Sequence, residues 1–75
     1  MKDKVLIIGA QGAGKTRLAK ELASRLGYML VDEVASIEDV KKKATPNTIY
    51  VSNAIDEKTA LWHLEDFTII KLIII

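Results

Sequence analysis

The chain contains no cysteine, which excludes a disulfide framework and a thiolate metal site. Proline occurs once among its 75 residues, and aromatic residues make up 5% of them. No apolar run approaches the roughly 18 residues that cross a bilayer, and the first residues lack the apolar segment of a signal peptide. These absences predict a soluble, cytoplasmic protein with no membrane partner.

An excess of charge is also missing, because the formal net charge is +1. Composition therefore does not indicate a nucleic-acid partner. The three lysines at 41–43 are interpreted as a solvated helix end, and Trp62 as a core or surface residue rather than a platform for a stacked base. A content of 49% hydrophobic and 28% charged residues indicates a globular chain, and its length predicts one minimal domain, residues 1–75.

The most informative stretch runs from Gly9 to Thr16 and matches the phosphate-loop pattern G-x-x-x-x-G-K-[ST] at every defined position. An apolar segment, residues 5–8, precedes it as an expected strand, and a helical pattern follows at 17–26. Glycines let backbone N–H groups approach an anion, and a helix N-terminus attracts one. Lys15 is expected to reach the outer phosphates, and the Thr16 hydroxyl to bind Mg²⁺. The residues expected to bind the nucleotide are Gly9, Gln11, Gly12, Ala13, Gly14, Lys15, Thr16 and Arg17.

Polar residues follow two further expected strands. Asp32 and Glu33 come after an apolar strand at 28–31, and Asn53 comes after a strand at 48–52. The carboxyl ends of parallel strands meet at one edge of a sheet, so these groups are expected to converge on the phosphate loop. Asp32 is predicted to bind Mg²⁺, directly or through water, and the catalytic candidates are Lys15, Glu33 as general base and Asn53 as the group that orients water. The alternative for Asp32, Glu33 and Asn53 is a solvated strand end or turn residue.

The order of expected elements is strand, helix, strand, helix, strand, helix, strand. Two shorter helices are expected near 37–44 and 57–65, the second with Leu61 and Leu64 turned inward, and a last strand at 67–75. This alternation predicts an α/β fold with a parallel sheet and right-handed crossovers. The expected helix N-caps are Ser36 and Asp56.

Together these motifs resemble the P-loop ATPases, and within them a compressed AAA+ core. The phosphate loop looks like their Walker A motif, residues 30–33 look like Walker B, and residues 49–53 look like the strand that ends in the sensor asparagine. The resemblance implies a three-layer α/β/α fold of the P-loop NTPase type with four parallel strands in the order 4-1-3-2. It also implies Mg²⁺-dependent binding of ATP.

The sequence departs from AAA+ proteins in two respects. The first two motifs are closer together than usual, and no arginine follows Arg25. ATP hydrolysis is therefore expected to be weak, or to depend on an arginine from a second subunit or a larger ATPase. One alternative is a non-enzymatic module that docks on a larger ATPase or self-assembles through its apolar last strand. Another is a small-molecule kinase, since the short spacing also resembles shikimate and adenylate kinases, although the arginines that those kinases use are not found.

Overall fold

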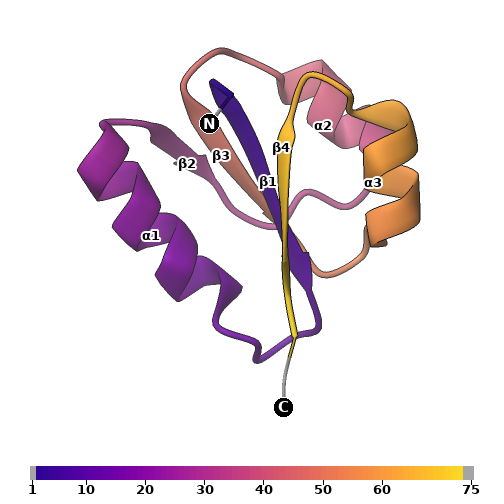
Figure 1. Ribbon diagram of the computed structural model, residues 1–75, viewed down its shortest axis with the longest axis horizontal. Helices are drawn as coiled ribbons and strands as arrows, with labels where there is room; N and C mark the ends of the chain where they lie inside the picture. The colour runs from indigo at the N-terminus through magenta and orange to yellow at the C-terminus, as the bar shows by residue number, and fades with distance from the viewer. Residues whose placement is uncertain (1, 74–75) are drawn as a thin grey trace.

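The computed structural model describes residues 2–73, in which strands and helices alternate as expected (Figure 1). None of its helices is long and apolar enough to cross a membrane, within these described residues. Residues 74–75 of the expected last strand lie outside them. The strands are β1 (Lys4–Gly9), β2 (Met29–Val31), β3 (Thr48–Ser52) and β4 (Thr68–Leu72), and the helices are α1 (Lys15–Leu26), α2 (Ile37–Lys43) and α3 (Glu57–His63).

All paired strands run parallel in one sheet with the order β2-β3-β1-β4. This is the predicted order 4-1-3-2 read from the other edge, so the α/β fold class and the strand order are confirmed. Helix α1 covers one face of the sheet, while α2 and α3 cover the other (Figure 1). The carboxyl end of β1, where the phosphate loop begins, therefore lies inside the sheet with β3 on one side and β4 on the other.

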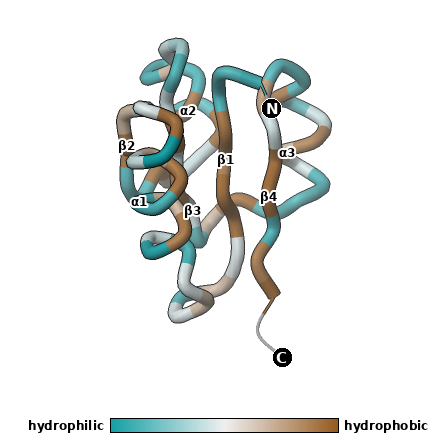
Figure 2. Tube along the Cα trace, turned by 60° about the vertical axis from the view of Figure 1, so that its left-hand side comes forward, coloured by the Kyte–Doolittle hydropathy of each residue, from teal (hydrophilic) through white to brown (hydrophobic). Residues whose placement is uncertain are grey.

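Strand β1 carries apolar side chains on both faces because helices cover both faces. Val5 and Ile7 pack into the cluster beneath α1, and Leu6 and Ile8 pack into the cluster beneath α2 and α3. All four side chains are buried. Figure 2 shows β1 and β4 as hydrophobic segments of the trace. This burial gives the phosphate loop a rigid support at the point where the chain leaves the core.

The ends of the helices follow the predicted capping residues. Ser36 accepts the Asp39 N–H at 3.2 Å at the start of α2, and Asp56 accepts the Thr59 N–H at 3.2 Å at the start of α3. Hydrogen bonds from the Thr59 hydroxyl and N–H hold the pKa of Asp56 below its usual value. Gly27 ends α1 in the left-handed conformation with φ of 72°.

The inward orientation predicted for Leu61 is wrong, because its side chain is 58% exposed. Ala60 and Leu64, one turn apart on α3, occupy the inward face and are buried. Leu61 follows Ala60 directly and is therefore rotated by about 100° around the helix axis. Trp62 lies further outward and is 80% exposed, which makes it a surface residue of α3.

Gly9 ends β1 at a position where a side chain has no room. Its φ is 153°, and a Cβ built there would lie 2.7 Å from the carbonyl oxygen of Leu72, its register partner on β4. We therefore expect Gly9→Ala to lower the free energy of unfolding by about 2–3 kcal/mol in urea denaturation, through this overlap and the unfavourable φ.

Gly27→Ala is the matched control for this change. Gly27 also has a positive φ, but a Cβ there meets nothing within 4 Å, so only the backbone conformation is penalised, by about 1 kcal/mol. A cost of Gly9→Ala no larger than that of Gly27→Ala would contradict a tight contact between β1 and β4.

Candidate nucleotide-binding site

The phosphate loop turns the chain from the end of β1 into α1. Within it, the Ala13 N–H donates to the Ala10 carbonyl at 3.2 Å. Gly12 and Gly14 have φ values of 85° and 86°, in the left-handed region that favours glycine. Gly14 is the N-cap of α1, and its carbonyl accepts the first helical hydrogen bond, from the Leu18 N–H at 3.1 Å.

Helix α1 begins without the features that neutralise the partial positive charge at the N-termini of the other two helices. No side chain caps its N-terminus, and its first turn contains no acidic residue. By contrast, α2 and α3 each have a side-chain cap and carboxylates in the first turn. The N–H groups at the start of a helix carry a partial positive charge, and an uncapped start leaves them available to an anion.

Lys15 adds a full positive charge at the same place. Its side chain folds back over the loop, where Nζ donates to the Ala10 carbonyl at 2.6 Å, and the residue is 7% exposed. No carboxylate forms an ion pair with it within residues 2–73. Burying a cation without a negative partner is unfavourable. The loop therefore holds a charge that an anionic ligand would compensate.

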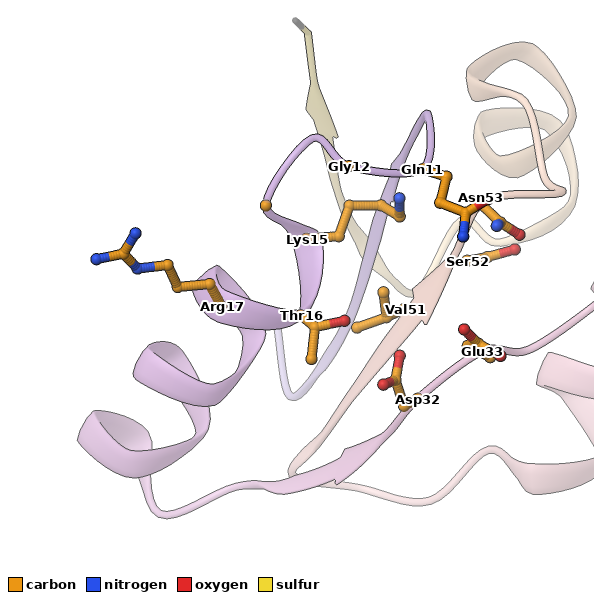
Figure 3. A pocket seen from close by; sticks show the side chains of 11 residues that line it. Gln11, Gly12, Lys15, Thr16, Arg17, Asp32, Glu33, Val51, Ser52 and Asn53 are labelled. Carbon is orange, nitrogen blue, oxygen red and sulfur yellow. The ribbon is translucent and has the colours of Figure 1, made fainter.

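Asp32 and Glu33 form the opposite wall, where they bulge out of the sheet. Val31 is the register partner of Tyr50 on β3, and the Val34 N–H donates to the Val51 carbonyl at 2.9 Å. β2 itself ends at Val31, and Asp32 and Glu33, here called the bulge, lie between these two contacts with β3. Glu33 adopts a φ of 56°, which is rare for a residue other than glycine, asparagine or aspartate. The bulge carries both carboxylates toward the loop (Figure 3).

Asn53 is presented by a turn that Ser52 stabilises. The buried Ser52 hydroxyl accepts the N–H groups of Ala54 and Ile55 at 3.1 and 3.3 Å. Asn53, between Ser52 and Ala54, is exposed at the end of β3, beside the phosphate loop. Ser52 thus has a structural role here, and Asn53 supplies the free amide.

These groups surround one cavity of about 400 Å³. In Figure 3 the Thr16 hydroxyl and the Asp32 carboxylate face the same space, and Gln11 lies beside Asn53. Arg17 belongs to the lining but extends away from the cavity. The lining of the cavity combines phosphate-loop residues with residues from the ends of β2 and β3: Gln11, Gly12, Gly14, Lys15, Thr16, Arg17, Asp32, Glu33, Val51, Ser52 and Asn53.

The structure thus brings the candidate residues of three strand ends together, as their spacing predicts. Gly9 and Ala13 are set apart from the cavity lining, the first against β4 and the second in the turn of the loop. Val51 is a lining residue that the sequence did not single out. An apolar residue inside a strand looks like any other core residue, so no signal in the sequence distinguishes it.

A protein-family model described as an AAA domain matches residues 4–64. This match covers the phosphate loop, the bulge and the end of β3, and it ends before β4. The chain belongs to this AAA domain family. The geometry of the loop and the family agree on a nucleotide-binding function of the P-loop type. No curated protein matches the sequence.

In this AAA domain, groups of opposite charge face each other across the cavity. The loop side offers positive partial charge and Lys15, while the bulge offers two carboxylates. A polyphosphate can be neutralised on the first side, and a cation can be shared between the phosphates and the second side. The cavity is therefore polarised along the direction from α1 to β2.

The left-handed conformation of Glu33 gives a testable prediction. Asparagine adopts positive φ more readily than glutamate or glutamine, so Glu33→Asn should be more stable to urea than Glu33→Gln by about 0.5–1 kcal/mol. Glu33→Gln keeps the side-chain length and the strained backbone, and both variants remove the same charge. Equal stability of the two variants would contradict a strained bulge.

Proposed function

We propose that this domain binds Mg²⁺–ATP and hydrolyses it slowly unless a partner completes the site. The observation that carries the proposal is the uncapped start of α1 beside the buried amino group of Lys15, which has no anionic partner within the described chain. A chain of phosphates is the ligand for which this combination is suited. Backbone N–H groups of residues 12–16 would surround the phosphates, and Lys15 would contact the outermost ones.

The residues on the two walls also suit Mg²⁺. No group of three metal-ligating side chains exists within residues 2–73, so a closed protein cage for a metal is not present there. Mg²⁺ in nucleotide sites commonly uses one or two protein oxygens together with phosphate oxygens and water. The Thr16 hydroxyl and the Asp32 carboxylate face one space and fit that role (Figure 3). When bound, the ion would reduce the charge repulsion around the outer phosphates.

Glu33 and Asn53 are proposed to act on water. Glu33 would accept a proton from a water molecule that attacks the terminal phosphorus, so that ATP and water give ADP and inorganic phosphate. The Asn53 amide, which both donates and accepts hydrogen bonds, would hold that water or the terminal phosphate. Both side chains line the cavity that Lys15 lines from the other side.

Fast hydrolysis would need a second cationic side chain in the cavity besides Lys15. Within residues 2–73, no arginine side chain points into the cavity. The chain has two arginines, Arg17 and Arg25. Arg17 extends away from the cavity (Figure 3), and Arg25 lies in the last turn of α1. An arginine that stabilises the transferring phosphate contributes several orders of magnitude to hydrolysis in related chemistry. We propose that a second copy or a larger ATPase supplies it.

Binding is tested by thermal unfolding with and without Mg²⁺–ATP. A ligand at 100 times its Kd adds about 2.7 kcal/mol to stability, which corresponds to a rise in Tm of about 10 °C for so small a domain. We expect this rise in the wild type and its loss in Lys15→Ala. Lys20→Ala, which removes an exposed lysine on α1 away from the cavity, is the matched control and should keep it. No rise in the wild type would contradict the proposal.

Hydrolysis is tested by release of phosphate from labelled ATP in single-turnover experiments. We expect the wild-type chain alone to turn over at about 10⁻³ s⁻¹ or slower, because a second cation is missing from the cavity. Glu33→Gln should lower this rate by about 100-fold while the thermal shift with Mg²⁺–ATP remains. Turnover of about 1 s⁻¹ by the purified chain would contradict dependence on a partner.

A second candidate function is that of an interaction module. β4 lies at the edge of the sheet, and Lys71 is the one charged residue among its five. An apolar edge strand is a template for pairing with another chain. Light scattering with and without nucleotide separates the two functions. A monomer in every condition would contradict self-assembly and leave nucleotide binding as the function.

A further inference from the structure

We infer that the cavity recognises the triphosphate and its metal ion without reading the base, so that its ligands are nucleoside triphosphates of any base and inorganic tripolyphosphate. This inference rests on the proposed function, because it specifies which part of a nucleotide the same site binds. It goes further in naming the ligand class, and it predicts that adenine itself adds nothing to affinity.

Apart from Arg17, which extends outward, the charged groups of the cavity are placed for phosphate or metal. The start of α1 and Lys15 form one wall, and Asp32 and Glu33 form the other. The two amides in the lining, Gln11 and Asn53, both lie on the side of the cavity opposite Arg17 (Figure 3). This is the end of the cavity at which we place the terminal phosphate, so these amides are separated from a nucleoside by the length of the phosphate chain.

The aromatic residues of the chain all lie outside the lining of the cavity. Tyr50 and Phe67 are buried together beneath α2 and α3, with ring centroids 5.6 Å apart. Tyr28 precedes β2 and packs into the cluster beneath α1, at the opposite end of the strand from Asp32. Trp62 lines a separate surface hollow on α3, with Lys58, Thr59 and His63. Stacking on an aromatic ring is a main source of base affinity, and no ring of this chain borders the cavity.

The rim of the phosphate loop is open where a nucleoside would leave the cavity. A Cβ built on Gly12 or on Gly14 meets no atom within 4 Å. Arg17, the lining residue of the first helical turn after Thr16, is exposed and extends outward (Figure 3). Ribose and base would therefore project over this rim into solvent. Contacts with such an exposed, solvated arginine give little discrimination between bases.

The test compares ligands that share the triphosphate and differ in what is attached to it. Binding of ATP, GTP, CTP and inorganic tripolyphosphate to the wild-type chain is measured by titration calorimetry at constant Mg²⁺ and ionic strength. We expect all four Kd values to agree within about fivefold, because a single stacked base would contribute at least that factor. Lys15→Ala should weaken the binding of all four ligands. Sodium sulfate at equal ionic strength should not displace them from the wild-type chain.

Two results would overturn the inference while leaving the proposed function in place. One is a single nucleotide that binds more than about fivefold tighter than the other two. The other is that tripolyphosphate binds more than about fivefold more weakly than ATP, which would show that the nucleoside contributes to affinity. Absence of binding by all four ligands, or equal binding by Lys15→Ala, would instead contradict the proposed function together with the inference.

Discussion

The start of α1 is the constraint on which the site depends. β1 is buried on both faces and must deliver the chain from the middle of the sheet into a helix that packs back on the same sheet. The short reversal uses left-handed glycines and leaves the helix without a side-chain cap. The same reversal folds Lys15 into the loop. An anion at this point would complete both the hydrogen bonding of the helix and the neutralisation of the lysine.

The strand order determines what faces this helix start. β3 lies next to β1, so Asn53 at its end is close to the loop, and β2 lies one strand further out. With strands about 4.8 Å apart, a carboxylate at the end of β2 would lie far from the loop if the strand continued regularly. The bulge at Asp32 and Glu33 follows the last paired residue of β2, and both residues line the cavity together with the phosphate loop. A strained backbone at Glu33 is thus coupled to the composition of the opposite wall.

Much of the fold could be predicted from the sequence because its signals are local. The apolar run before the phosphate loop, the capping residues Ser36 and Asp56, and Gly27 after α1 each act within a few residues. Together these local signals leave few possible topologies for four strands and three helices. The orientation of Leu61 was predicted wrongly, because a short helix with apolar residues at adjacent positions does not specify by itself which of them faces the sheet.

The site could be predicted less completely than the fold. The motif indicates Lys15 but not its hydrogen bond to the Ala10 carbonyl, and it does not indicate that Arg17 extends outward. The left-handed φ of Glu33 was also not predictable, because glutamate has no preference for it, and the next residue, Val34, is held by a hydrogen bond to Val51 on β3. These features arise from contacts between segments that are distant in the sequence, which composition and spacing do not encode.

The central claim is that the uncapped start of α1 receives the phosphates of a nucleotide, and amide NMR tests it most directly. The ¹⁵N-labelled chain would be titrated with Mg²⁺–ATP, and the N–H signals of each helix start followed. We expect the largest shifts at Gly12, Gly14, Lys15 and Thr16, with the capped starts of α2 and α3 little changed. Shifts concentrated on α2 and α3, or around Trp62, with the phosphate loop unaffected would contradict it.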